Sequence, residues 1–302
     1  MTTSAIWIDL RLIHMLLGAA FLLIAYFMPD YAGSLAFQQR VPLNVRVANN
    51  ISTQIWGHFW NPAFSYPLKE QTVSTSALAL SCSLIPMGLI LVSTMIAFCV
   101  AHCGDPRTAP AENLEPNQAD LPGFTKWPLF RIGVRVMDGF SGLLESIAFT
   151  LFVSEVLKLA VGQPRPNYRK FHIEEPLDAI SSFPSAHSSL AFAGFTYASM
   201  TLWSDVAAPL IKKPKMNVLV LPLLLVCTAP LCVASWIAVT RVHDYQHTCV
   251  DILAGAVIGL SSSVMLFCIH ASVPKPSFIV PPEPVKEVEK EPNKVLLTMS
   301  KP

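Results

Sequence analysis

Apolar residues in this chain are grouped into long blocks that alternate with polar segments. Six such blocks stand out, at residues 12–28, 76–102, 137–157, 186–203, 217–239 and 250–270. A helix of about 20 mostly apolar residues spans the hydrocarbon core of a bilayer. The pattern therefore predicts an all-α fold, a polytopic membrane bundle of six transmembrane helices.

The blocks differ in composition. The first block, 12–28, is the shortest and contains His14, but no basic cluster precedes it and Asp9 lies just upstream. We therefore expect a retained membrane helix rather than the core of a cleaved signal peptide. The third block contains Glu145 and Glu155, and the fourth is rich in Ala and Ser, which suits close helix packing.

Composition supports a membrane protein. Hydrophobic residues make up 52% of the 302 residues and charged residues only 14%, whereas soluble domains have about 25% charged residues. The net charge of +1 and the lack of a basic run argue against a nucleic-acid partner. The seven cysteines lie mostly in predicted helices and form no CxxC pair, so no disulfide framework is expected.

Lys and Arg set the expected orientation. Six crossings put both termini on one side, and that side carries 13 of the 21 basic residues. We therefore expect cytoplasmic termini. The glycosylation pattern Asn50-Ile51-Ser52 falls in the opposite loop, 29–75. We divide the chain into a membrane domain, 1–273, and a proline-rich tail, 274–302, expected to be disordered in the cytoplasm.

Ionisable residues gather in two loops, 158–184 and 240–249, that follow the third and fifth blocks. Both loops therefore face the same, non-cytoplasmic side. The first loop begins with Lys158 and contains Arg165 between Gly and Pro residues. These cations suit an anionic ligand, although two basic residues at a helix end also anchor helices at lipid headgroups.

A second cluster, "SSFPSAHSSLAF", begins the fourth block. Pro184 suits the first turn of a helix and serine suits its cap. A helix N-terminus presents free N–H groups that favour a phosphate, and His187 lies in that first turn. On its own, His187 would be an ordinary interfacial residue.

The third cluster is "TRVHDYQHTCVD", at 240–251. His247 and Asp251 are four residues apart at the start of a helix, so they share a face. A carboxylate that hydrogen-bonds one ring nitrogen makes the other a better nucleophile or base. An interfacial ion pair is the alternative, but ionisable groups at the start of a membrane helix are costly and usually functional.

Together the clusters supply three cations, two histidines and a carboxylate. This set suits phosphoryl transfer, which needs cations and N–H donors for the phosphate oxygens, a nucleophile and an acid. The clusters contain no Asp-rich cage for a metal. A metal site built from His187, His247 and Asp251 is a weaker alternative.

The spacings resemble a known signature. Lys158-x6-Arg165-Pro166, then Pro184-Ser185-Ala186-His187, then Arg241-x5-His247-x3-Asp251 resembles the three-part signature of the type 2 phosphatidic acid phosphatase superfamily, the integral membrane lipid phosphate phosphatases. The motifs span 158–251. The chain departs from the family in two places, since Ala186 replaces the usual Gly and Thr240 replaces the usual Ser.

The resemblance implies a role for each matching residue. His247 is the nucleophile, Asp251 orients it, and His187 protonates the departing oxygen. The phosphate is bound by the remaining matching residues, which are Lys158, Arg165, Arg241, Ser185 and Ala186. No metal and no cofactor are implied.

Other polar residues receive smaller roles. We expect Glu155 to pair with Lys158, and Glu145 to hydrogen-bond inside the bundle. His243 and Asp244 would line the site at most. The remaining histidines show no constellation in the sequence and receive no role; these are His14, His58, His102, His172 and His270.

The resemblance implies metal-independent hydrolysis of lipid phosphomonoesters such as phosphatidic acid, lysophosphatidic acid, diacylglycerol pyrophosphate or sphingoid and ceramide phosphates. The implied partners are a lipid phosphate and the bilayer, in the endoplasmic reticulum, plasma or vacuolar membrane. The sequence leaves the physiological substrate and homo-oligomer formation open. Two alternatives remain: a lipid phosphotransferase with the same phosphoenzyme, and a non-catalytic lipid-binding or transport protein.

Overall fold

The structure is a computed structural model. It describes residues 3–32, 44–48, 56–60, 62–103, 128–171, 178–212 and 218–273. The glycosylation pattern at Asn50 and the predicted tail, 274–302, lie outside the described residues.

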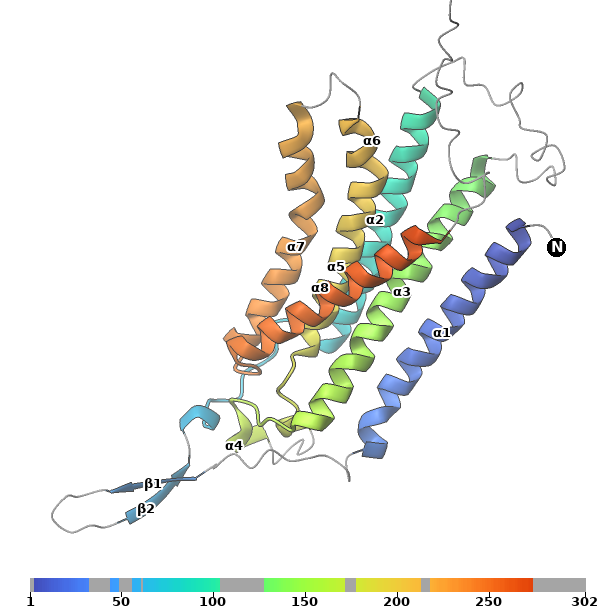
Figure 1. Ribbon diagram of the computed structural model, residues 1–302. Coiled ribbons are helices and arrows are strands. Elements are labelled where there is room, and N and C mark those ends of the chain that lie inside the picture. The colour runs from blue at the N-terminus through green and yellow to red at the C-terminus, as the bar shows by residue number, and fades with distance from the viewer. Residues whose placement is uncertain are drawn as a thin grey trace, which may run out of the picture.

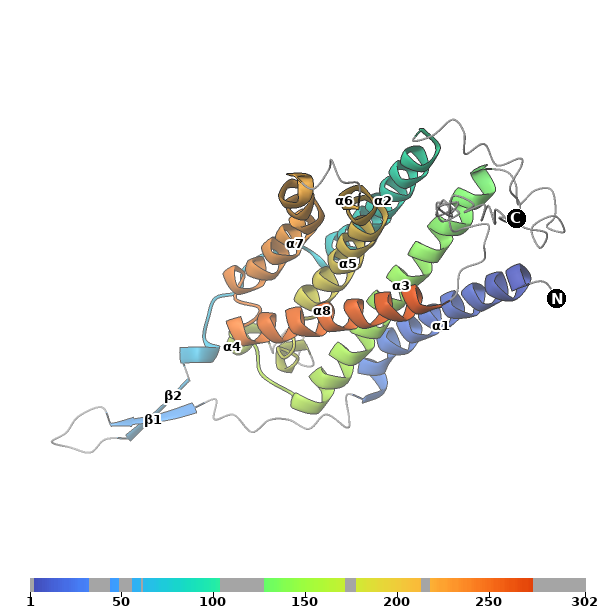
Figure 2. The same ribbon diagram turned by 45° about the horizontal axis from the view of Figure 1, so that its top comes forward.

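Long helices dominate the described chain, and each predicted block coincides with one of them. They are α1 (Thr3–Ala32), α2 (Thr75–Cys103), α3 (Pro128–Val161), α5 (Ala186–Leu202), α7 (Val220–His243) and α8 (Cys249–Ser272). Figures 1 and 2 show these helices gathered into one elongated bundle. The predicted helical bundle is therefore confirmed.

Short elements join the long helices. They are η1 (Pro62–Phe64), α4 (Tyr168–Phe171), η4 (Asp178–Ile180), the π-helical turn η5 (Trp203–Ala207) and α6 (Ala208–Ile211).

A small hairpin accompanies the helices of the predicted all-α fold. Strands β1 (Asn44–Ala48) and β2 (Trp56–Trp60) pair in an antiparallel register, with Asn44 opposite Trp60. The hairpin lies at the end of the bundle where α4 is found (Figure 1). Block-scale apolar periodicity does not detect such short strands.

Three helical segments are long and apolar enough to cross a membrane, namely Thr75–Val100, Val220–His243 and Cys249–Ser272. Large apolar side chains on these helices point away from the protein, among them Leu225 and Val250. Within the described part of α1, a shorter apolar stretch covers Arg11–Ala25. Such surfaces are typical of a protein whose solvent is lipid.

Helix α5 is the centre of the bundle. Most of its residues are buried, and many are small, including Ala191, Ala193 and Ala198. It crosses α8 closely, because a Cβ atom on Gly255 would lie 2.6 Å from the carbonyl oxygen of Ser185. The composition of the fourth block thus serves close packing, as expected.

A buried polar network fixes α1 to the bundle. Arg11 forms an ion pair with Asp138 of α3 at 2.7 Å and donates to Nδ1 of His270 at 2.8 Å. Glu145 of α3 binds His14 at 3.0 Å and Nε2 of His270 at 2.9 Å. The interior hydrogen-bonding role expected for Glu145 is confirmed. No sequence pattern indicated that His14 and His270 would be the partners of Glu145.

Candidate active site

The two predicted site loops meet at one end of the bundle, where α3 ends and α5 and α8 begin (Figure 1). Arg165 of the first loop donates to Oε1 of Gln246 in the second at 2.8 Å. Gln163 donates to Asp251 at 3.2 Å, and the backbone N–H of Ser185 donates to the carbonyl oxygen of Asp251 at 3.1 Å. All three sequence clusters therefore contribute to one buried site.

His247 lies in the turn between α7 and α8 and is only 4% exposed. Its Nδ1 lies 2.7 Å from the carbonyl oxygen of Ser182. A carbonyl oxygen can only accept, so this contact places the ring proton on Nδ1 and leaves the lone pair on Nε2. The backbone N–H of His247 donates to the carbonyl oxygen of Arg241 at 3.3 Å, which fixes the turn.

Asp251 does not form the direct hydrogen bond to His247 that the spacing suggested. Its Oδ2 lies 3.9 Å from His247 Nδ1, and it accepts instead from the Ser182 hydroxyl at 2.7 Å. Oδ2 also accepts from the backbone N–H of Thr248 at 2.8 Å, and Thr248 caps α8 in return. Helix capping competes for the carboxylate and fixes its position. Asp251 is thus linked to His247 through Ser182.

The N-terminus of α5 lies beside this pair. Ser185 caps the helix and Ala186 is its first residue, whereas Pro184 precedes the cap instead of lying in the first turn. The backbone of Val73 lies beside the ring of His187. The Nε2 atom of His187 is buried with no hydrogen-bond partner among the described residues. A buried nitrogen without a partner is costly unless a ligand completes it.

Arg165 is held rigidly at the base of the site. Its Nε donates to the carbonyl oxygen of Asp178 at 2.8 Å and its second guanidinium nitrogen to the Asp178 carboxylate at 2.6 Å. Burial raises the pKa of Asp178, but the charge of Arg165 and the hydroxyl of Ser181 lower it more, so the pKa lies below its usual range. Asp178 therefore stays ionised and holds Arg165.

Lys158 and Arg241 approach from α3 and α7. Lys158, in the last turn of α3, forms the predicted ion pair with Glu155 at 2.7 Å. Arg241 is 1% exposed and donates to Asp244 at 3.0 Å. Both cations act electrostatically on His187, as does Arg165, so the three positive charges surround one histidine.

The cations also affect His247. Burial lowers the pKa of this imidazole well below its ordinary value of 6.5, and the charges of Arg165 and Lys158 lower it further. The hydrogen bond to Ser182 opposes this shift and does not outweigh it. His247 is therefore neutral at physiological pH, which is the form that can act as a nucleophile.

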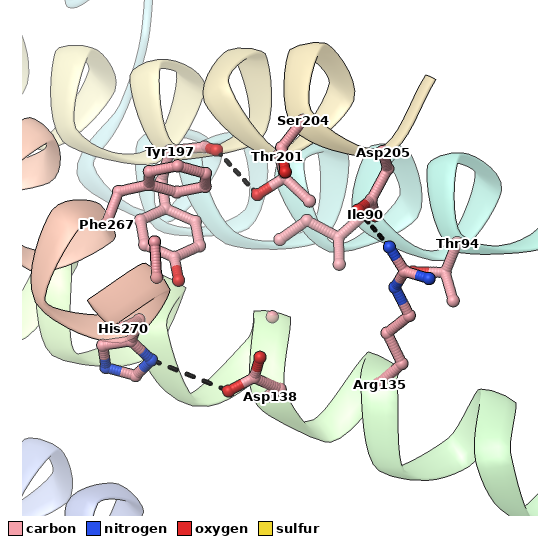
Figure 3. Close-up of a pocket in the computed structure, with 12 residues that line it drawn as sticks. Ile90, Thr94, Arg135, Asp138, Tyr197, Thr201, Ser204, Asp205, Phe267 and His270 are labelled. Atoms are coloured by element: carbon pink, nitrogen blue, oxygen red, sulfur yellow. Dashed lines mark hydrogen bonds and ion pairs between the residues drawn. The ribbon is translucent and has the colours of Figure 1, made fainter. Parts of the chain in front are cut away.

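A separate polar cavity of about 60 Å³ lies in the other half of the bundle. Figure 3 shows Arg135, Asp138, Asp205 and His270 around it, on α3, η5 and α8. It shares no residue with the candidate site.

A metal would find its ligands elsewhere in the bundle. Among the described residues, the ligand atoms of His14, Glu145 and His270 lie within 4.8 Å of one another. Those of His187, His247 and Asp251 do not form such a group. In the first group, the hydrogen bonds from Arg11 and to Glu145 already use both ring nitrogens of His270.

Residues 140–274 match the family model of the PAP2 superfamily. The resemblance to this superfamily is confirmed. A PA-phosphatase related-family protein of Dictyostelium discoideum is 36% identical over 42% of this chain and 46% of its own length. Lipid phosphate phosphatase 1 of Arabidopsis thaliana is 32% identical over 45% of each chain. A probable diacylglycerol pyrophosphate phosphatase 1 of Schizosaccharomyces pombe is 30% identical over 42% of this chain and 51% of its own.

The chain spans about half the length of the relatives it matches. No solved structure matches it. The matched segment, 140–274, contains every residue of the three motifs.

The sequence motifs do not include the neutral and acidic residues that hold the motif side chains in place. Ser182 joins His247 to Asp251, Gln163 supports Asp251, and Gln246 and Asp178 hold Arg165. Ser182 and Gln163 lie inside the loops already singled out, but their residue types give no distinctive spacing. Their roles depend on contacts between residues up to 88 positions apart in the sequence.

Proposed function

We propose that this chain hydrolyses lipid phosphomonoesters, without a metal, through a phosphohistidine intermediate. The observation that carries the proposal is the environment of His247, a neutral imidazole whose Nδ1 is held by the carbonyl of Ser182 and whose pKa is lowered by burial and by neighbouring cations. The PAP2 match and the relatives named as lipid phosphate phosphatases support a lipid phosphate as substrate.

In the first step, Nε2 of His247 attacks phosphorus. A P–N bond forms while the P–O bond to the lipid alcohol breaks. His187, which takes up a proton when the anionic phosphate binds beside it, gives that proton to the departing oxygen. Negative charge on the phosphoryl oxygens is stabilised by the cations Lys158, Arg165 and Arg241, with the hydroxyl of Ser185 and the N–H group of Ala186 at the start of α5.

In the second step, water attacks the phosphohistidine. His187, now neutral, takes a proton from the water, and the P–N bond breaks to release inorganic phosphate and regenerate His247. Asp251 acts through the Ser182 hydroxyl and through the cap of α8, which together fix the position of His247. Positive side chains and a helix terminus here supply the charge stabilisation that Mg²⁺ supplies in other phosphoryl transfer sites.

We propose six membrane crossings with both termini in the cytoplasm and the active site at the non-cytoplasmic face. The predicted excess of basic residues on the terminal side supports this orientation. A substrate can then keep its acyl chains in the bilayer while its phosphate enters between the helix ends. A glycan at Asn50, or tags accessible in loop 29–75 from outside the cytosol, would test it.

The test of hydrolysis is phosphate release from phosphatidic acid in mixed micelles that contain EDTA. We expect release by the wild-type protein, and a loss of at least about a thousandfold in the His247→Ala variant, as for lost nucleophiles in other enzymes. Cys249→Ser is the matched control, because this exposed thiol lies two residues away from His247 in the sequence.

An unchanged rate in His247→Ala would overturn the mechanism. Transfer of the phosphate to an added alcohol, without free phosphate, would favour a phosphotransferase. Lipid binding without turnover in the wild type would favour a non-catalytic protein.

A further inference from the structure

Residues 71–73 lie against the second and third clusters of the site, although the sequence motifs do not include these residues. This segment lies between the hairpin and α2, more than 80 residues before the first motif. Gln71 accepts from a guanidinium nitrogen of Arg241 at 3.4 Å, and Thr72 donates twice to Asp244. The backbone of Val73 lies beside the ring of His187.

The strongest of these links joins Thr72 to Asp244. The backbone N–H of Thr72 donates to Oδ2 of Asp244 at 2.7 Å, and its hydroxyl donates to Oδ1 at 2.7 Å. Both carboxylate oxygens are therefore used. Asp244 itself is fully buried, whereas the side chain of Thr72 lies near the surface.

Asp244 carries this link on to the phosphate-binding cation. Its Oδ2 also accepts from Arg241 at 3.0 Å, and His243 approaches Oδ1 at 3.4 Å. Burial raises the pKa of Asp244, but the hydrogen bonds from Thr72 and the charge of Arg241 lower it more, so the pKa lies below its usual range. The carboxylate is therefore ionised and fixes one side of the Arg241 guanidinium.

We propose that Thr72 and Asp244 are positioning residues that hold Arg241 in the orientation that binds the substrate phosphate. The proposal rests on the proposed function of the site. Without Thr72, the Asp244 carboxylate can rotate, and Arg241 then follows it away from the phosphate. The active site is thus built from a fourth segment as well as the three motifs, and this segment controls how well the phosphate is held.

The experiment compares Thr72→Val, Thr72→Ser and Asp244→Asn with the wild type. Thr72→Val removes one hydrogen bond to a charged group, and Thr72→Ser keeps it. Orthovanadate serves as the phosphate analogue, and its inhibition constant is measured together with kcat/KM for phosphatidic acid. Thr228→Val is the control, since this exposed hydroxyl on the same helix as Arg241 donates only to backbone carbonyls of its own helix.

We expect the vanadate inhibition constant of Thr72→Val to rise about tenfold, with a similar fall in kcat/KM, because a hydrogen bond to a charge is lost. Asp244→Asn should show a larger effect in the same direction. Thr72→Ser and Thr228→Val should match the wild type. A merely structural role would lower the amount of folded protein without changing the inhibition constant of the folded fraction.

An unchanged vanadate inhibition constant in both Thr72→Val and Asp244→Asn would overturn the proposal. Failure of the proposed function is distinguishable, because the wild type itself would then release no phosphate. In that case vanadate affinity is measured by thermal shift. Weaker vanadate binding by Thr72→Val than by the wild type still supports the positioning of Arg241, and equal binding by the two proteins overturns it.

Discussion

The two ring nitrogens of His247 have different environments, which the proposed nucleophilic role requires. Nδ1 is fixed by the Ser182 carbonyl at 2.7 Å, and the cations Lys158 and Arg165 disfavour a second proton on the ring. Ser182 also donates to Asp251, so one serine connects the nucleophile to the carboxylate. The position of His247 therefore depends on Ser182 as much as on the motif residues.

Replacing Ser182 with Ala tests that link. The substitution removes the hydroxyl bound to Asp251 and keeps the backbone carbonyl that binds His247. A hydrogen bond to a buried charge is worth about 1.5–3 kcal/mol, so we expect kcat/KM to fall by roughly tenfold to a hundredfold. Ser182→Ala and Asp251→Asn should be non-additive when combined. Fully additive losses would show that Asp251 does not act through Ser182.

The pH dependence of activity tests the charge state of His247. The pKa of this imidazole lies well below 6.5, so the unprotonated nucleophile persists as the pH falls through 6.5. We therefore expect the acidic limb of kcat/KM that arises from His247 to lie below pH 6.5. The measurement is a pH profile with phosphatidic acid in micelles of constant composition. A limb centred at or above pH 6.5 would contradict the account.

At the scale of elements, the site depends on how closely α5 and α8 cross. A Cβ atom on Gly255 would meet the Ser185 carbonyl at 2.6 Å, and one on Gly259 would clash with the Ser189 carbonyl. These glycines let the capped ends of the two helices meet, so that Ser185 and Asp251 lie side by side.

Gly255→Ala should therefore disturb both stability and catalysis. Overpacking in a tight interior typically costs about 1–3 kcal/mol, and the start of α5 would move away from Asp251. We expect a lower thermal midpoint and reduced phosphate release. Gly88→Ala on α2 is the control, because nothing lies within 4 Å of its new Cβ atom. Equal behaviour of the two variants would rule out a special role for the crossing.

The elements were predictable where hydrophobicity alone determines them. The block 250–270 corresponds to α8 at Cys249–Ser272, and the block 76–102 to α2 at Thr75–Cys103. Helix α3 begins at Pro128, earlier than its apolar block, because its first turns carry polar residues that a hydropathy pattern omits. The motif spacings identified the candidate site residues, but Ser182 and Thr72 bind partners that only the tertiary fold brings near.

At the scale of the whole molecule, buried charges attach α1 to the rest of the bundle. Arg11 is fully buried and binds Asp138, while His14 and His270 share the carboxylate of Glu145. These residues lie on three helices separated by more than 100 positions in the chain, and the isolated histidines therefore gave no signal in the sequence.

Breaking this network should destabilise the protein without touching the active site. Arg11→Leu leaves the buried Asp138 without the cation it pairs with, and removal of one partner of a buried ion pair costs about 3–5 kcal/mol. The thermal midpoint in detergent should fall clearly. The double variant Arg11→Leu with Asp138→Leu should recover much of the lost stability, because neither charge of the pair is then buried without the other. A double variant less stable than Arg11→Leu would show that the pair is not the main attachment.

The proposed mechanism requires His247 to carry the phosphoryl group. Rapid quenching of the reaction with phosphate-labelled phosphatidic acid is the direct test. We predict label bound to the wild-type protein within the first turnover, stable to base and released by acid, as a phosphohistidine requires, with the labelled peptide containing His247. The His247→Ala variant should carry none. Turnover by the wild type with no protein-bound label, or the same label in His247→Ala, would contradict the account.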